Sequence, residues 1–251
     1  MHLHIVQIDL SDPRISIYAV RAGGADPDGD GEWQTTLAPT SVAARREDFA
    51  VAINANYFGV KESHQILGQR IPYFNGNYAK INGWAVSNGE KVSLERGNVS
   101  LFVHQSGDIT IEHYPLLPAD VREAVSGAPM LVQAGKIGQD AANPKEAPAP
   151  HTGVGLDEAR KTMTMMVVDG RRDGYSVGLS SRDFAMEFLK LGCHTALSLD
   201  GGGSSTLVMR DEGGRTWTVK NRPSDGHQMW GDPSIERCVA FVLGVKYDDS
   251  K

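Results

Sequence analysis

The chain has 251 residues, and its 25 Lys and Arg against 31 Asp and Glu leave a formal net charge of -6. This length can bury a sizeable core, and the ordinary apolar content argues against intrinsic disorder. A mildly acidic chain lacks the basic face that non-specific nucleic-acid or anionic-membrane binding requires. No apolar run approaches the ~18–20 residues that cross a bilayer. We therefore expect neither a nucleic-acid partner nor a membrane span.

The first ten residues, MHLHIVQIDL, lack the basic start, long apolar stretch and small-residue cleavage site of a signal peptide. The compartment is left open: extracytoplasmic if a signal preceded this numbering, otherwise cytoplasmic. The two cysteines, Cys193 and Cys238, both lie in apolar stretches. This placement predicts buried, inert thiols, with a single bridge as the alternative.

Apolar alternation and short apolar runs predict a strand-rich chain. The expected strands are 3–10, 14–20, 50–54, 99–104, 109–113, 162–168, 196–199, 206–209 and 238–245. The turn formed by Ser11, Asp12 and Pro13 predicts that the first two strands form a hairpin.

Helices are expected only at 40–48, 119–124 and 181–191. The third has the strongest pattern, because Ser180 and Asp183 form a capping box and Gly192 follows the last turn. The Pro- and Ala-rich stretch 139–150 is typical of an extended loop and not of a domain linker. We therefore expect one strand-rich α+β domain over 1–251, with mixed sheets and a few packing helices.

The strongest local signal is the stretch ALSLDGGGSST, in which an apolar strand ends at Asp200 and three glycines follow. Exposed backbone N–H groups at Gly201, Gly202 and Gly203, with the Ser204 hydroxyl beside them, can form a nest for an anionic oxygen. A tight strand-to-strand turn is the alternative. The stretch is not a P-loop, because it lacks the lysine and the glycine spacing.

A second apolar strand, TMTMMVV, ends at Asp169 and is followed by Gly170 and Arg171. Because a helix is expected between the two Asp-Gly turns, both carboxylates should lie at one edge of a sheet. Arg171 could then offer a planar fork to a phosphate or carboxylate. A surface turn with solvated arginines is the alternative interpretation.

The segment INANYFG places Asn54 at a strand end beside Tyr57. Amides can bind sugar hydroxyls and an aromatic ring can stack on a sugar face, although asparagine is also a common turn residue.

The acidic segment DPDGDGE places Asp26, Asp28, Asp30 and Glu32 at calcium-loop positions. Position 12 of that loop, where a bidentate Glu belongs, is Leu37, and no helices flank the segment. We therefore expect no cofactor and a solvated acidic loop, with a calcium site as the weaker alternative.

The order of these motifs resembles the phosphodiester glycosidase family. The family pattern has an Asn-Gly-Gly-Tyr-Phe-like turn, a Ser-Gly-x-Pro-x-Leu stretch, an Arg-Thr-Ala-x-Gly strand entry, an Asp-Gly-Arg turn, a helix, Leu-Asp-Gly-Gly-Gly-Ser-Ser and Asn-x-Pro-Ser-Asp. The matching segments here are NANYF at 54–58, SGAPML at 126–131, HTGVG at 151–155, DGR at 169–171, LDGGGSS at 199–205 and NRPSD at 221–225. His151 stands where the family has Arg, and Ala55 and Asn56 replace the two glycines.

This resemblance implies hydrolysis of a sugar-1-phosphodiester, which releases a sugar and a phosphomonoester. The substrate would be a small molecule or a polysaccharide such as an exopolysaccharide, with N-acetylglucosamine as a candidate sugar. The implied catalytic residues are Asp200, Asp169 and His151. The implied substrate-binding residues are Asn54, Tyr57, Arg171, Gly201, Gly202, Gly203, Ser204 and Asn221.

Chemistry supports this assignment, because a phosphate monoester is a weakly basic leaving group that needs little general-acid help. Which aspartate acts as base or nucleophile, and whether the C–O or P–O bond breaks, stays open at this stage. The alternative function is a sugar-phosphate or cell-wall binding module without turnover.

Overall fold

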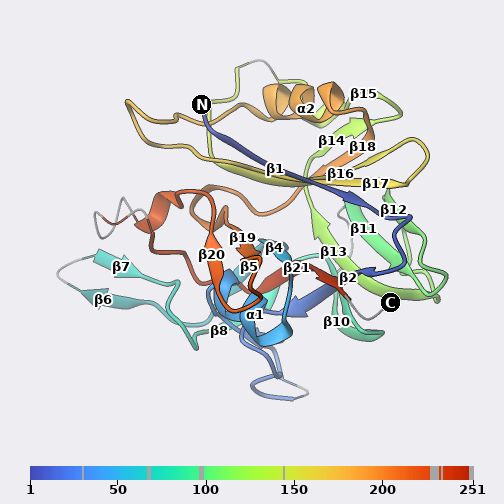
Figure 1. The fold of residues 1–251 in the computed structure, drawn as a ribbon. Helices are drawn as coiled ribbons and strands as arrows, with labels where there is room; N and C mark the ends of the chain where they lie inside the picture. Colours follow the sequence, from blue (N-terminus) through green and yellow to red (C-terminus); the bar gives the residue numbers. More distant parts are fainter. Residues whose placement is uncertain are drawn as a thin grey trace.

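The computed structural model describes residues 1–29, 31–66, 69–95, 99–143, 145–226, 232 and 234–248. Within these residues the chain forms antiparallel sheets with few helices, which confirms the predicted strand-rich α+β fold (Figure 1). No helix in these ranges is long and apolar enough to span a membrane.

Three larger sheets make up most of the described fold. The six-stranded sheet has the order β1 (Leu3–Asp9), β17 (Thr162–Val168), β16 (His151–Asp157), β18 (Cys193–Ser198), β14 (Met130–Gln133) and β15 (Lys136–Ile137). One five-stranded sheet has the order β2 (Ile15–Arg21), β21 (Phe241–Tyr247), β4 (Val51–Asn54), β19 (Leu207–Arg210) and β20 (Trp217–Val219). The other has the order β10 (Glu90–Leu94), β9 (Trp84–Ser87), β13 (Val121–Gly127), β11 (Val99–His104) and β12 (Ile109–Glu112).

Smaller elements surround these sheets. They are the three-stranded sheet of β3 (Thr35–Thr36), β8 (Tyr78–Ile81) and β5 (Phe58–Val60), the hairpin of β6 (His64–Ile66) and β7 (Gln69–Ile71), and 3₁₀ turns at Gln139–Ala141 and Gly202–Ser204.

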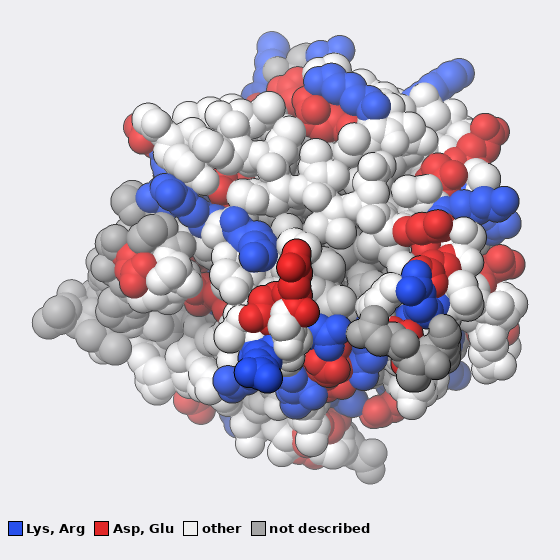
Figure 2. Space-filling view, viewed as in Figure 1, with Lys and Arg blue, Asp and Glu red and all other residues white. Residues whose placement is uncertain are grey.

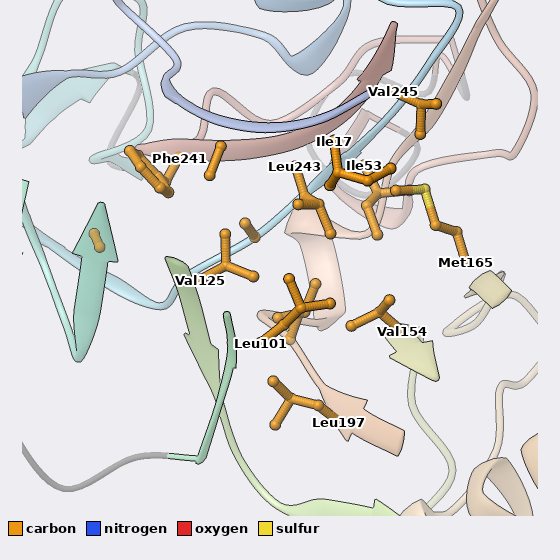
Figure 3. Close-up of a cluster of buried hydrophobic side chains, with 14 of the residues drawn as sticks. Ile17, Ile53, Leu101, Val125, Val154, Met165, Leu197, Phe241, Leu243 and Val245 are labelled. Atoms are coloured by element: carbon orange, nitrogen blue, oxygen red, sulfur yellow. The ribbon is translucent and has the colours of Figure 1, made fainter. Parts of the chain in front are cut away.

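One apolar core joins the three larger sheets. Leu243 of β21, Leu101 of β11 and Val154 of β16 all belong to it, and Figure 3 shows them pointing toward one another. The outer face of each of two sheets is covered by a helix: α1 (Thr40–Glu47) packs on β4 and β19, and α2 (Ser181–Lys190) packs on β14 and β18 (Figure 1). Strand β17 is buried on both faces, because Met165 and Val167 belong to the central core while Met166 and Val168 belong to the cluster that contains Phe184 of α2. This explains its nearly continuous apolar sequence.

The structure corrects two predicted elements. The segment expected to be a helix at 119–124 instead begins strand β13, whose residues pair with both β11 and β9. The expected hairpin of the first two strands does not form, because β1 pairs with β17 while β2 pairs with β21 in another sheet. Pairing partners far along the chain outweigh local propensity and a good turn sequence here.

The helix at 181–190 and its cap are confirmed: the Ser180 hydroxyl accepts a hydrogen bond from the Asp183 N–H at 3.1 Å. Cys193 and Cys238 are both free and buried, as the first of the two alternatives predicted. On the face shown in Figure 2, acidic and basic side chains are intermixed and form no continuous basic area.

Candidate active site

The two Asp-Gly turns lie at the same edge of the six-stranded sheet. Strands β17 and β18 both pair antiparallel with β16, so they run in the same direction on its two sides. His151, the first residue of β16, is opposite Val168, and Gly153 is opposite Ser198. Asp169 and Asp200 therefore both emerge next to the beginning of β16, which confirms the predicted shared edge.

The three-glycine loop carries the chain from this sheet to the β4 sheet. The Asp200 N–H donates to the Ala55 carbonyl at 2.9 Å, and the Gly202 N–H donates to the Pro150 carbonyl at 2.9 Å. Gly202 has a φ of +61°, and a Cβ on Gly203 would overlap the Asp225 carboxylate and the Arg237 guanidinium. The glycines thus allow a tight turn and the close approach of charged side chains.

A cavity of about 330 Å³ opens at this edge. Its walls come from the end of β18, the beginning of β16, the turn after β17 and the segment before β21. The lining residues are Tyr57, Ala149, Pro150, His151, Arg171, Asp200, Gly201, Gly202, Gly203 and Arg237. Seven of the predicted site residues are therefore brought together: Tyr57, His151, Arg171, Asp200, Gly201, Gly202 and Gly203.

Asp200 is the carboxylate that lines this cavity. Burial raises its pKa to about 6, although hydrogen bonds from Ser204 and the Gly201 N–H and the positive charge of Arg237 act in the opposite direction. Ser204 itself is fully buried within the loop, so it contacts the Asp200 carboxylate and does not line the cavity. A carboxyl group with this pKa can exchange protons near neutral pH.

His151 lines the same cavity as Asp200, and among the described residues only one of its two ring nitrogens has a hydrogen-bond partner. Its Nε2 lies 2.9 Å from the Leu179 carbonyl, which can only accept, so Nε2 carries the proton and Nδ1 is left with its lone pair. The ring stacks on Phe184 with 5.0 Å between centroids. Burial lowers the pKa of His151, so the ring is neutral and Nδ1 can accept a hydrogen bond at neutral pH.

Two guanidinium groups border the cavity. Arg171 has a φ of +59° and its guanidinium lies against Gly202, and within the described residues its side chain has no hydrogen-bond or ion-pair partner. Arg237 donates from Nε to the Asp225 carboxylate at 2.6 Å, and its NH1 lies 3.3 Å from the Ser204 hydroxyl. Arg171 is thus free to bind an anion, and Arg237 is held in place.

Asp169 lies beside the cavity and does not line it. Its Oδ1 accepts from the Arg222 N–H and the Asn221 amide, at 2.9 and 3.2 Å, and its Oδ2 is 2.8 Å from the Tyr175 hydroxyl and 3.0 Å from His4 Nε2. Asn221 also bonds to the backbone of Ser205 and Leu207. Asp169 and Asn221 are both buried and bonded to several partners, so the structure does not bring these two predicted site residues to the cavity surface.

Asn54 is likewise internal. Its amide donates to the Asp200 carbonyl at 2.5 Å, and its Oδ1 accepts from Thr152 and from the Thr206 N–H. A sugar therefore cannot reach this side chain, and Asn54 positions the loop of Asp200. Tyr57 does line the cavity, and its hydroxyl donates to the Ala128 carbonyl at 3.0 Å. Burial and the charge of Asp200 raise its pKa to about 12, so Tyr57 stays protonated.

Arg237 was not predicted as a site residue, and its partner Asp225 was noted only as the last residue of the NRPSD motif at 221–225. The available signal was the position of Arg237 immediately before the apolar run CVAFVLGV, which contains strand β21.

The acidic segment 26–32 shows ordinary turn contacts: Asp26 accepts from the N–H groups of Asp28 and Gly29. Asp30 is outside the described residues. Among the residues described, no group of three or more His, Cys, Asp or Glu side chains could hold a metal ion.

The fold is similar to solved structures of low sequence identity. The zebrafish N-acetylglucosamine-1-phosphodiester alpha-N-acetylglucosaminidase catalytic domain, auto-inhibited by its pro-peptide, matches with a TM-score of 0.68 and 21% identity, over 98% of this chain and 83% of that one. A putative exported protein from Burkholderia pseudomallei K96243 matches with a TM-score of 0.68 and 15% identity, over 97% and 73% of the two chains.

A hypothetical protein from Synechocystis matches with a TM-score of 0.56 and 18% identity, and this chain spans 59% of its length. No curated protein sequence matches this chain. The phosphodiester glycosidase family model, however, matches residues 47–246, which include every residue that lines the cavity. The chain therefore belongs to the phosphodiester glycosidase family.

Proposed function

We propose that this protein hydrolyses a sugar-1-phosphodiester into a free sugar and a phosphomonoester, with Asp200 as the reacting carboxylate. The observation that carries the proposal is the placement of Asp200, with its raised pKa, in the same cavity as the fixed Arg237 and as Arg171, whose side chain pairs with no residue that the structure describes. An anionic diester bound there would lie next to a carboxylate and two cations.

The arginines suit the leaving group. Breaking the bond between the sugar and the phosphate oxygen releases a phosphate monoester dianion, which two guanidinium groups stabilise more strongly than the singly charged diester. Such binding favours the transition state over the ground state, so it contributes to turnover as well as to affinity.

One carboxylate is enough for this reaction. Ordinary glycosidases use a second carboxylic acid to protonate a poorly leaving alcohol, whereas the phosphomonoester needs no such proton. A reaction that needs a single carboxylate fits this cavity, because Asp200 lines it while Asp169 lies outside it and accepts a hydrogen bond from Tyr175. Above pH 6 the ionised Asp200 would take a proton from a water that attacks the anomeric carbon, and Nδ1 of His151 would orient that water. Alternatively, Asp200 would attack the anomeric carbon itself, and water would then hydrolyse the resulting glycosyl ester. On both routes the C–O bond to the phosphate breaks and its electron pair leaves with the phosphomonoester.

The test is a turnover assay on several sugar-1-phosphodiesters, including one of N-acetylglucosamine. Asp200→Asn is expected to lower kcat/KM by ~100-fold or more, as loss of positioned proton transfer does. In the wild type, kcat/KM should rise with pH through about 6 and then level off, because the ionised form is the active one. Asp173→Asn, an exposed aspartate on the neighbouring turn, is the matched control and should keep full activity.

Two further measurements separate the alternatives. Arg171→Gln should raise KM by ~10-fold, since it removes one charged phosphate contact, while Arg182→Gln on the exposed side of α2 should not. In ¹⁸O-labelled water the label should enter the sugar, and label in the phosphate would instead mean attack at phosphorus. Diester binding without any turnover would overturn the proposal in favour of the binding module.

A further inference from the structure

A groove of about 270 Å³ lies between helix α1 and the hairpin of β19 and β20, which pack against each other (Figure 1). Its lining residues are Ser41, Val42 and Arg45 from the helix and Arg215, Thr216 and Trp217 from the hairpin. None of these residues lines the cavity of Asp200, and none of them is acidic. The groove is therefore a second and separate hollow, with two positive charges in its wall.

The two arginines of this groove are not engaged within the fold. Arg45 and Arg215 are both exposed, and neither guanidinium has a hydrogen-bond or ion-pair partner among the residues that the structure describes. By contrast, the next arginine of α1, Arg46, is bonded to Glu47 and to two backbone carbonyls. A guanidinium presents parallel N–H donors that match two oxygens of a phosphate group. Two such groups in one groove provide the donors for this anion.

An indole ring supplies the apolar part of the groove. Trp217 is half-buried, and its Nε1 donates to the Phe49 carbonyl at 2.8 Å, which holds the ring in place. Val42, which is 40% exposed, lines the same groove. The C–H face of a sugar ring can pack on such a surface, while the hydroxyls at the edge of the sugar stay in water and lose no hydrogen bonds. The groove thus combines a surface for a sugar ring with donors for an anionic substituent.

The two walls of the groove are fixed by contacts with the rest of the fold. In α1, the N–H of Ser41 donates to the Glu236 carboxylate at 3.1 Å, and the Ser41 hydroxyl donates to the same carboxylate. In the hairpin, the Asp211 carboxylate accepts from the Arg215 N–H at 2.8 Å and from the Thr216 hydroxyl at 2.6 Å. A site whose walls are formed in advance loses little conformational freedom when a ligand binds.

We propose that this groove binds a sugar that carries a phosphate group, with the phosphate on Arg45 and Arg215 and the sugar ring on Trp217. The choice of a sugar rests on the proposed function, because a substrate made of phosphate-linked sugars supplies such a group. The volume suits one residue of that kind, since a cavity of about 150 Å³ already holds benzene and the groove has about 270 Å³. Binding here would retain a phosphorylated glycan on the protein at a surface other than the cavity of Asp200.

The experiment follows the NMR signal of the Trp217 indole N–H, assigned with Trp217→Phe, during titration with N-acetylglucosamine-1-phosphate. A saturable shift is expected, with a Kd ~10-fold lower than for N-acetylglucosamine or inorganic phosphate alone, because only the sugar phosphate uses both parts of the groove. Arg45→Gln and Arg215→Gln should each raise this Kd ~10-fold, since each removes a charged hydrogen bond. Arg182→Gln, at an exposed arginine of α2, is the matched control and should leave the Kd unchanged.

The same titration of Arg171→Gln separates the groove from the cavity of Asp200. The Trp217 shift should persist there with an unchanged Kd, and its loss would overturn the proposal, because the shift would then report binding at the cavity. Absence of a shift in the folded wild type, or an equal Kd for inorganic phosphate alone, would also overturn it. Turnover assays on the same protein are independent: hydrolysis without a Trp217 shift contradicts this site alone, and a Trp217 shift without hydrolysis contradicts the proposed function alone.

Discussion

The pKa values of two aspartates at one sheet edge are shifted in opposite directions by their surroundings. For Asp200, burial dominates and raises the pKa to about 6. For Asp169, burial also acts to raise the pKa, but hydrogen bonds from His4, the Arg222 N–H and Tyr175 together outweigh it and hold the pKa below its ordinary value. Asp200 is therefore suited to chemistry and Asp169 to holding the structure together.

Asp200 should reduce stability at neutral pH. Its folded pKa of about 6 is above the ordinary value of 3.8, so folding favours the protonated form, and that contribution is lost as pH rises from about 4 to 6. Asn is neutral throughout, so Asp200→Asn should be more stable than the wild type at pH 7, by ~1–3 kcal/mol, and nearly equal to it at pH 4. Urea unfolding at the two pH values measures this. A variant less stable at pH 7 would contradict the assigned pKa.

Asp169 should show the reverse pattern. Its pKa is lowered in the folded protein, so its contribution is present above the unfolded value and is lost as pH falls through the folded one. Asp169→Asn turns an amide toward groups that donate hydrogen bonds and should cost ~2–4 kcal/mol at pH 7. The difference from the wild type should shrink below pH 4. Asp108→Asn, at an exposed aspartate, serves as the control, and equal urea midpoints for Asp169→Asn and wild type would refute this role.

At the scale of elements, the position of His151 depends on how α2 lies across β16. A Cβ on Gly153 would be 2.9 Å from Cε1 of Phe184 and 3.0 Å from the Leu197 carbonyl. A Cβ on Gly155 would be 2.8 Å from both the Phe188 ring and the Cys193 sulfur. The glycines of β16 thus let the two phenylalanines of α2 pack directly on the strand, and Phe184 in turn stacks on His151.

Gly153→Ala should therefore affect both stability and activity. The added methyl must displace Phe184 or the neighbouring backbone, and overpacking of this kind costs ~1–3 kcal/mol. Because Phe184 supports His151, kcat/KM should fall as well. Gly59→Ala in β5 is the control, since nothing lies within 4 Å of its added methyl. Thermal unfolding and the turnover assay check the pair, and equal behaviour of the two variants would contradict this account.

Helices and strands could be predicted from the sequence where the residues of the element itself determine its secondary structure. The capping box at Ser180 and the apolar run at 162–168 were sufficient to predict helix α2 and strand β17. Strand β13 was mistaken for a helix, because its identity depends on pairing with β11 and β9. The apolar pattern did not predict strand β16, and only the family resemblance indicated that a strand begins at HTGVG. Its two glycines have low strand propensity, and they are needed there because the phenylalanines of α2 pack against them.

The same distinction applies to the site. The turns of Asp200 and Arg171 could be predicted, because a strand end followed by glycines is visible in the sequence. The sequence does not predict whether a given side chain points into the cavity, because this orientation depends on neighbouring residues from other sheets. Asn54 and Asp169 do not line the cavity and bond to partners within the fold, while Arg237 reaches the cavity from a segment far along the chain.

At the scale of the whole molecule, Asn54 connects two sheets and the loop that carries Asp200. It ends β4 in one sheet, and its Oδ1 accepts from the Thr152 hydroxyl of β16 in another, at 2.8 Å. The same oxygen accepts from the Thr206 N–H at 3.1 Å, and the amide donates to the Asp200 carbonyl at 2.5 Å. One fully buried amide thus holds both ends of the loop that carries Asp200.

Asn54→Ala should consequently loosen the junction between the sheets. The variant leaves a buried N–H, a hydroxyl and a carbonyl without their partner, and each such group costs ~1–3 kcal/mol. We expect a loss of stability larger than that of Gly153→Ala, and a fall in kcat of ~10-fold or more because Asp200 is no longer held. Amide hydrogen exchange should accelerate at Thr206 and Asp200 before it does in β11, which lies in the third sheet. Asn75→Ala, at an exposed asparagine, should change none of these. Uniform acceleration across all three sheets would mean that Asn54 supports global stability and not specifically the junction at the Asp200 loop.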